Sequence, residues 1–135
     1  MTRVVVFGTF DPLHDGHRFF LEQAARLGDS LIVVAARDSY ITSQKQRTPR
    51  VPAVERQAAL EAVPQVDTFV WGDEWPAADS QRLLRELDFE VVALGYDQEP
   101  SDEVACEWLK AAGKPDVQVV RLRPHEKYIL KSSLL

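Results

Sequence analysis

The sequence predicts an α/β fold with an open, doubly wound, parallel sheet of five strands, in a single domain that spans residues 1–135. Short apolar runs of strand length alternate with longer segments of helical period, and no internal repeat or low-complexity tract interrupts them. A chain of 135 residues with 45% hydrophobic side chains can also bury one core without metal or disulfide support. Because parallel strands require crossover connections, we expect the loops that follow the strands to meet at one edge of the sheet, where such folds bind ligands.

The first strand and the first helix are predicted near the N-terminus. Residues 4–7 form a run of β-branched and aromatic side chains, and residues 8–12, Gly-Thr-Phe-Asp-Pro, end this run in a loop. From His17 onward, apolar side chains recur at intervals of three and four residues, which is typical of a helix. We expect Gly28 to end this helix in the left-handed backbone conformation.

A second strand and a polar segment follow. Residues 31–36 form another apolar run, which predicts a buried strand. Residues 37–50 are polar, and a loop of this length is more often functional or mobile than incidental. We therefore interpret the segment as a flap over a ligand site. Its basic side chains are Arg37, Lys45, Arg47 and Arg50.

The rest of the chain continues the alternation of helices and strands. Pro52 suits the first turn of a helix that extends to residue 63 and is stopped by Pro64. Gly113 is expected to cap a later, acid-rich helix. The remaining predicted elements are strands at residues 68–71, 91–94 and 117–122 and helices at residues 80–87 and 102–112.

Composition and charge restrict the partners of the protein. The sequence has 16 Lys and Arg against 21 Asp and Glu, for a net charge of -5, so no basic excess supports nucleic-acid binding. No run is long or apolar enough to cross a membrane. The single Cys106 cannot form an internal disulfide, and the N-terminus lacks the order of a signal peptide, so we predict a cytoplasmic location. A small-molecule ligand is therefore expected in preference to a polymer.

The most informative segment is residues 8–17, Gly-Thr-Phe-Asp-Pro-Leu-His-Asp-Gly-His, at the end of the first strand. Gly8 and Gly16 allow backbone amides to approach a ligand, and the unpaired N–H groups at the N-terminus of the following helix favour an anion. His14 and His17 are three residues apart, so both imidazoles can face one site. The arrangement suits a polyphosphate. If a nucleoside triphosphate is attacked at its α-phosphorus, two imidazole N–H donors can stabilise the negative charge that develops.

These residues resemble the HxGH nucleotidyltransferase superfamily, which includes cytidylyltransferases, phosphopantetheine adenylyltransferase and archaeal-type FAD synthases. His14-Asp15-Gly16-His17 matches the motif letter for letter. Similar segments are PAVERQAAL at residues 52–60, ALGYDQ at 93–98 and KSSLL at 131–135. The resemblance implies a Rossmann-like fold and the transfer of a nucleotidyl group from a nucleoside triphosphate to a phosphate of an acceptor, with release of pyrophosphate. It also implies magnesium or another divalent cation bridged by the substrate phosphates, and a homodimer.

The resemblance assigns catalytic roles to four positions. His14 and His17 would stabilise the pentacoordinate phosphorus. Lys45 would neutralise charge on the α-phosphate, although another basic residue of the segment 37–50 could serve instead. Arg56 resembles the family arginine that meets the acceptor or the triphosphate, and a planar guanidinium suits bidentate phosphate recognition.

A second set of positions would contact the nucleotide. The first loop and the first helix turn would line its pocket, the segment after the fourth strand would border the base, and two late serines would hold the outer phosphates. Asp11 would order the first loop. The full predicted set is Gly8, Thr9, Phe10, Asp11, His14, Gly16, His17, Gly95, Tyr96, Asp97, Ser132 and Ser133.

Three functions stay open at this point. The first is adenylyl transfer from ATP to FMN, favoured because ALGYDQ and the short chain look most like archaeal-type FAD synthases. The second is transfer of CMP from CTP to glycerol 3-phosphate or a similar small phosphate. The third is a nucleotide-binding module without turnover, because the sequence ends at Leu135, before the arginine that the family's late motif contains. A dinucleotide-binding oxidoreductase is excluded because the GxGxxG spacing is missing.

Two other residue types are interpreted as packing groups. Trp71, Trp75 and Trp108 each lie beside an apolar strand or helix segment, so we expect them to pack and not to stack on a base. Cys106 is expected to be a small buried side chain without a nucleophilic function.

Overall fold

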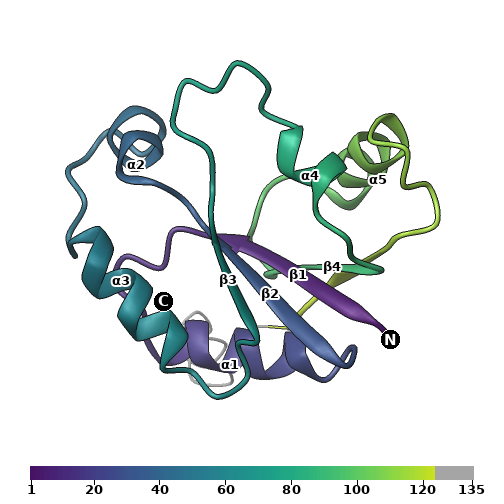
Figure 1. Cartoon of the computed structure of the whole chain (residues 1–135), viewed down its shortest axis with the longest axis horizontal. Helices are drawn as coiled ribbons and strands as arrows, with labels where there is room; N and C mark the ends of the chain where they lie inside the picture. The colour runs from purple at the N-terminus through teal and green to yellow at the C-terminus, as the bar shows by residue number, and fades with distance from the viewer. Residues whose placement is uncertain (124–135) are drawn as a thin grey trace, which may run out of the picture.

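Residues 1–123, the part of the chain that this computed structural model describes, contain one sheet of five parallel strands (Figure 1). The strand order is β3-β2-β1-β4-β5, so the chain first builds the sheet outward on one side of β1 and then on the other. The strands are β1 (Arg3–Gly8), β2 (Ser30–Ala35), β3 (Thr68–Trp71), β4 (Val91–Leu94) and β5 (Gln118–Arg121). The predicted open, doubly wound sheet is confirmed.

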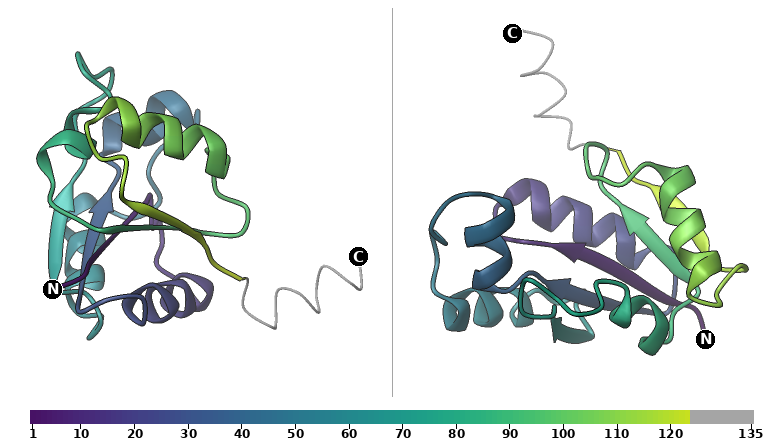
Figure 2. Two further views of the ribbon diagram at one scale, coloured as in Figure 1. Left: turned by 90° about the vertical axis from the view of Figure 1, so that its right-hand side faces the viewer. Right: turned by 90° about the horizontal axis from the view of Figure 1, so that it is seen from above.

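Helices cover both faces of this sheet. They are α1 (Asp15–Ala25), α2 (Asp38–Gln44), α3 (Ala53–Glu61), α4 (Arg82–Glu86) and α5 (Asp102–Ala111). Figures 1 and 2 show α1 and α3 on one face and α4 and α5 on the other. Val4 and Val6 belong to the core layer of α1 and α3, whereas Val5 belongs to the layer of α4 and α5. Side chains alternate across a strand, so the apolar run in β1 supplies both layers. No helix within residues 1–123 is long and apolar enough to cross a membrane.

The pairing of β1 differs on its two sides, and this difference positions the site. β1 pairs with β2 along its whole length, from Arg3 to Gly8. It pairs with β4 only at Val4↔Val91 and Val5↔Val92. The carboxyl ends of β1 and β4 therefore separate at the point where the strand order reverses, and doubly wound folds bind their ligands in the crevice at such a point.

The first helix ends differently from the prediction. Its C-cap is Arg26 in the right-handed conformation, with φ −73°, so the expected left-handed cap at Gly28 is wrong. Gly28 is needed for another reason, because a Cβ there would lie 2.6 Å from the carbonyl oxygen of Thr2. Gly113, in contrast, has φ +79° just after α5, as predicted for a helix cap.

The polar segment 37–50 is only partly a loop, because α2 forms within it. The signal for this helix in the sequence is weak, because Ile41 is its one fully buried residue. Pro52 is the N-cap of α3, one position before the first turn in which the prediction placed it. The other strands and helices agree with the predicted positions to within about two residues, the ordinary uncertainty of element ends.

Candidate active site

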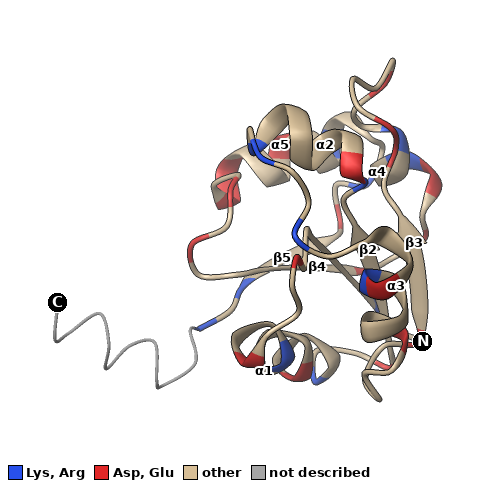
Figure 3. Ribbon diagram, turned by 90° about the vertical axis from the view of Figure 1, so that its left-hand side faces the viewer, with Lys and Arg blue, Asp and Glu red and all other residues tan. Residues whose placement is uncertain are grey.

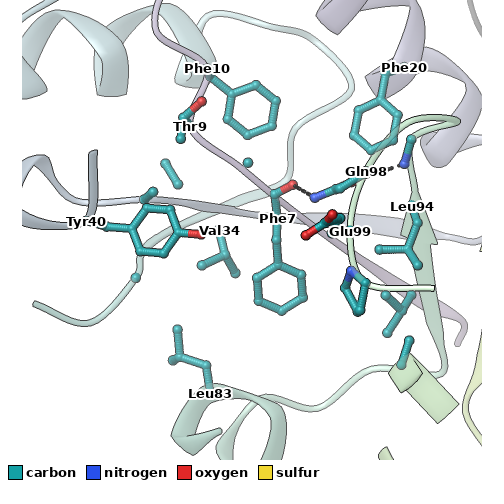
Figure 4. A pocket seen from close by; sticks show the side chains of 18 of the residues that line it. Phe7, Thr9, Phe10, Phe20, Val34, Tyr40, Leu83, Leu94, Gln98 and Glu99 are labelled. Carbon is teal, nitrogen blue, oxygen red and sulfur yellow. Dashed lines mark hydrogen bonds between the residues drawn. The ribbon is translucent and has the colours of Figure 1, made fainter. Parts of the chain in front are cut away.

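A cavity of about 1060 Å³ opens at the carboxyl ends of β1, β2 and β4, where β1 and β4 separate (Figure 4). Its walls come from the loops that follow these strands, from the first turn of α1, and from residues of α2, α4 and α5. The structure therefore brings most of the predicted site residues together. Those that line the cavity are Gly8, Thr9, Phe10, His14, Gly16, His17, Lys45, Gly95, Tyr96 and Asp97.

His14 and His17 are stacked at the start of α1, with ring centroids 3.7 Å apart and ring planes inclined by 19°. Nδ1 of His14 accepts the backbone N–H groups of Gly16 at 3.1 Å and His17 at 3.4 Å, so His14 is the N-cap of the helix. Nδ1 of His17 accepts the N–H of His14 at 3.3 Å. Because both Nδ1 atoms are acceptors, the proton of each neutral ring resides on Nε2. Two imidazole N–H groups thus belong to side chains that line the cavity.

The same capping bonds correct one expectation about the anion site. The sequence predicted unpaired amides at the helix N-terminus, but the amides of Gly16 and His17 are donated to His14. Charge of both signs is interspersed along the elements, and α1 itself carries acidic and basic residues (Figure 3). The charge pattern therefore offers no broad basic surface, and an anion would depend on local donors of the cavity.

The environment of His17 keeps its imidazole neutral. Burial, and next the proximity of His14, lower the pKa of His17 from 6.5 to about 4. The carbonyl of Pro12 and the charge of Asp97 act in the opposite direction and are outweighed. At neutral pH the ring is therefore a neutral hydrogen-bond donor through Nε2, without a full positive charge.

Asp11 fastens the segment between α2 and α3 to the end of β1. Its buried carboxylate accepts Nη1–H of Arg47 at 2.5 Å and the backbone N–H groups of Arg50 at 2.9 Å and Val51 at 2.7 Å. Burial alone would raise the pKa of Asp11, but these hydrogen bonds hold it below the ordinary value. Asp11 is not among the described residues that line the cavity. Its hydrogen bonds instead hold the segment that follows Lys45, a residue of the cavity wall.

The four basic residues of the segment 37–50 differ in what their side chains contact. Lys45, the C-cap of α2, is the one that lines the cavity in the described structure. Arg47 is bound to Asp11, and Arg37 donates to the carbonyl of Gly72 at 2.7 Å. Of the four basic side chains, Lys45 is therefore the one placed to meet a ligand.

Arg56 lies beneath the site, with a side chain that is 0% exposed. Its Nη1 donates to the carbonyls of Thr9 at 3.0 Å and Ala36 at 2.8 Å, which follow β1 and β2. Its Nη2 donates to Oδ1 of Asp38 at 2.6 Å, and the guanidinium lies over the ring of Trp71. Arg56 is not among the described residues that line the cavity, and its guanidinium lies under the strand ends.

Two residues that the sequence analysis did not single out shape the opposite wall. Gln98 bridges the separated strands, because Nε2 donates to the carbonyl of Phe7 at 2.7 Å and Oε1 accepts the N–H of Gly95 at 3.0 Å. Arg121 donates to the carbonyls of Gly95 at 2.7 Å, Gln98 at 2.6 Å and Pro100 at 2.9 Å. Gln98 could have been found as the last letter of ALGYDQ, whereas Arg121 at the end of β5 carried no signal.

Phe10 and Gly8 are matched in shape. Phe10 has φ 50°, which is uncommon for a residue other than glycine, and its ring is buried edge-on to His17 with centroids 5.2 Å apart. A Cβ at Gly8 would lie 2.8 Å from this ring. Gly8 therefore allows Phe10 to pack against His17 and fix one side of the imidazole pair.

Trp71 packs against the core as predicted, whereas the prediction that the other two tryptophans only pack stays untested. The prediction for Cys106 is wrong. Trp75 and Trp108 line the cavity, and Trp108 is 40% exposed. Cys106 was expected to be buried but is exposed on α5. The helical period alone did not reveal which face of α5 meets the sheet. The buried residues of this helix are Ala105 and Leu109. Ser132 and Ser133, predicted to bind outer phosphates, lie outside the described residues.

Comparisons with known proteins show which family the sequence matches. Residues 5–133 match the family model described as cytidylyltransferase-like. An FAD synthase from Methanosarcina mazei is 40% identical over 90% of this chain and 77% of its own length. An FAD synthase from Pyrococcus abyssi is 42% identical over 89% of this chain and 79% of its own length.

Solved structures share the fold of this chain. The crystal structure of a lipopolysaccharide core biosynthesis protein from Thermoplasma volcanium superimposes with a TM-score of 0.83. It is 31% identical and covers 93% of this chain and 98% of that chain. TmcAL from Thermotoga maritima, bound with alpha-thio ATP, has a TM-score of 0.63 at 12% identity over 99% of this chain and 51% of that chain, which shows a shared fold.

Proposed function

Since the chain belongs to the cytidylyltransferase-like family, we propose that it transfers the adenylyl group of ATP to FMN and releases pyrophosphate. Relatives named FAD synthase, 40% and 42% identical over most of the chain, support ATP and FMN as the substrates. The alternative transfer of CMP to glycerol 3-phosphate is not favoured by these relatives. The structural observation that carries the proposal is the stacked pair His14 and His17 in the wall of the cavity, with each Nδ1 accepting a backbone N–H.

The proposed reaction is a substitution at phosphorus. A phosphate oxygen of FMN attacks the α-phosphorus of ATP and forms the new P–O bond of FAD. The bond from the α-phosphorus to the oxygen that bridges to the β-phosphorus breaks, and pyrophosphate leaves with that oxygen and the electron pair. The attacking oxygen is already anionic at neutral pH, so the protein need not remove a proton. Its task is to position the two substrates and stabilise the developing charge.

The imidazoles supply that stabilisation in our proposal. Nε2–H of His14 and Nε2–H of His17 donate to the α-phosphoryl oxygens as negative charge builds up in the transition state. The capping bonds at Nδ1 hold each ring in place before the substrates arrive, so little reorganisation is needed during the reaction. One preorganised donor of this kind typically contributes about a hundredfold or more to the rate.

We divide the other predicted residues into those that contact the substrates and those that hold the site in place. Lys45 is the cation that we assign to the α-phosphate, and Thr9, Gly95, Tyr96 and Asp97 line the cavity where ATP would lie. We assign Arg56 a positioning role, because its Nη1 already donates to the carbonyls at the strand ends and its Nη2 to Asp38. Ser132 and Ser133 keep their predicted role at the outer phosphates.

A divalent cation fits this site only as a companion of the nucleotide. Within the described residues, no group of three or more His, Cys, Asp or Glu side chains could hold a metal ion. Magnesium prefers oxygen ligands and commonly takes them from substrate phosphates and water. When bound with ATP, such an ion neutralises phosphate charge. We also retain a homodimer and a cytoplasmic location as predictions; light scattering on the purified protein tests the first.

Product analysis tests the proposed activity. Purified protein is incubated with magnesium and each pairing of ATP or CTP with FMN or glycerol 3-phosphate, and pyrophosphate and FAD are quantified. We expect pyrophosphate and FAD in equal amounts from ATP with FMN. The proposal would be contradicted if the pairing of CTP with glycerol 3-phosphate were the only one to release pyrophosphate. ATP binding without any pyrophosphate would identify the chain as a module that binds without turnover.

A further inference from the structure

The cavity reaches both faces of the sheet around the end of β1. Figure 4 shows Phe10 and Phe20 on one side of this strand end and the ring of Phe7 with Leu83 on the other. The part of the cavity on the side of Phe7 and Leu83 lies between the sheet and helices α4 and α5, and we call it the apolar arm. It is lined by Phe7, Val34, Leu83, Leu84, Leu94 and Trp108.

The apolar arm suits an uncharged, flat group. None of its six side chains is charged, and Phe7 and Trp108 offer aromatic surfaces for stacking. Asp73 and Glu99 also line the cavity and would repel a phosphate. Lys45 and the two imidazoles provide the donors for phosphate elsewhere in the same cavity. The site therefore separates a place for phosphates from a place for an apolar ring.

Gln81 adds one polar group to this region. It lines the cavity, and its buried Oε1 has no hydrogen-bond partner in the part of the chain that the structure describes. A buried acceptor without a partner costs free energy, so it is expected to be satisfied in the functional complex. The carboxamide of glutamine presents an acceptor beside a donor. Its natural partner is a ring edge with an N–H next to a carbonyl.

We propose that the apolar arm binds the isoalloxazine ring of FMN, with the carboxamide of Gln81 paired to the N3–H and an adjacent carbonyl of the ring. This inference rests on the proposed function, because that function supplies the flavin. The ring is tricyclic and apolar on its faces, and its only N–H donor lies between two carbonyls, which matches the arm and Gln81. The ribityl chain then leads around the end of β1 and delivers the phosphate to His14 and His17.

Riboflavin is the probe that isolates the ring subsite, because it lacks the phosphate. Binding is measured from the quenching of flavin fluorescence and of tryptophan emission, in the intact chain without nucleotide. We expect Leu83→Ala to weaken riboflavin binding about tenfold, since removal of apolar contact from a pocket is worth that much. ATP affinity should not change. Leu87→Ala is the matched control, because Leu87 packs against the same core layer but does not line the cavity.

A second experiment tests the role of Gln81. The intact chain should bind N3-methylriboflavin at least about tenfold more weakly than riboflavin, because methylation removes the N–H and leaves the buried acceptor unpaired. Gln81→Leu should bind the two flavins with equal affinity. Equal affinities in the unsubstituted chain would overturn the pairing of Gln81 with N3–H.

The outcomes separate this inference from the proposed function. FAD synthesis with unchanged riboflavin and FMN affinity in Leu83→Ala would refute the placement of the ring and leave the function standing. Loss of ATP affinity in that variant would show that the arm holds adenine. Riboflavin binding that depends on Leu83 without FAD synthesis would support the placement and refute the function. Absence of both flavin binding and FAD synthesis would refute both.

Discussion

His14 and His17 cap α1 reciprocally, since each Nδ1 accepts the backbone N–H of the other residue, at 3.4 Å and 3.3 Å. One imidazole thus performs two tasks. Nδ1 stabilises the helix start, and Nε2 carries the proton that the proposed reaction requires. Replacement by alanine removes both groups at once, so it cannot separate stability from catalysis.

Asparagine at position 14 separates the two tasks. Its side-chain oxygen is a good N-cap acceptor, but it presents no donor where Nε2 lies. We expect His14→Asn to retain the unfolding free energy to within about 0.5 kcal/mol, whereas His14→Ala should lose about 1 kcal/mol. Both variants should lower kcat at least about a hundredfold. Denaturant unfolding and pyrophosphate release measure the two quantities, and near-normal turnover in either variant would refute the mechanism.

The lowered pKa of His17 predicts a pH dependence of stability. The pKa is about 4 in the folded chain and 6.5 ordinarily, so between these values the unfolded chain binds more protons than the folded one. The free energy of unfolding should therefore fall as the pH decreases from about 6.5 to about 4, by on the order of 1–2 kcal/mol after allowance for solvent screening. Denaturant unfolding across this range measures the slope. His17→Gln should flatten it, and equal slopes in the two proteins would contradict the prediction.

Much of the fold was predictable because its signals are local. The apolar runs of β1, β2 and β4 are buried on both faces, so they needed no alternation to be recognised. The failures have a different cause. α2 presents one fully buried residue, Ile41, and is held by contacts from distant segments, such as the bond from Ser39 Oγ to Glu74 at 2.7 Å. No local pattern contains that information.

The same distinction applies to the site. His14, Gly16 and His17 lie within four residues of one another, so their joint function could be inferred from spacing. Arg121 acts on a loop 21 to 26 residues earlier in the chain, through backbone carbonyls that any sequence provides. A residue that recognises carbonyls leaves no partner residue type to search for, and only the structure reveals it.

Asp11 offers a test of how the wall near Lys45 is supported. Asp11→Asn removes the charge that Arg47 and two backbone amides share, and it leaves one oxygen to accept them. We expect a loss of about 2–4 kcal/mol in unfolding free energy and a higher KM for ATP, because Lys45 loses its support. Thermal unfolding and steady-state kinetics measure these effects. Arg18→Ala, which breaks an exposed ion pair with Asp15, should change stability by less than about 1 kcal/mol. Equal effects of the two substitutions would contradict this assignment.

Arg56 distinguishes a positioning role from a substrate contact. Its fully buried guanidinium joins the carbonyls of Thr9 and Ala36 to the carboxylate of Asp38, a geometry that a lysine ammonium cannot reproduce. We therefore expect Arg56→Lys to lower the unfolding free energy by about 2–4 kcal/mol and to lower kcat without a selective rise in the KM for either substrate. If Arg56 instead contacted a phosphate, the lysine would retain the charge, stability would stay unchanged and one KM would rise alone. Unfolding curves and separate titrations of ATP and FMN therefore decide between the two roles. A positioning role changes the unfolding free energy and kcat, whereas a substrate contact changes one KM.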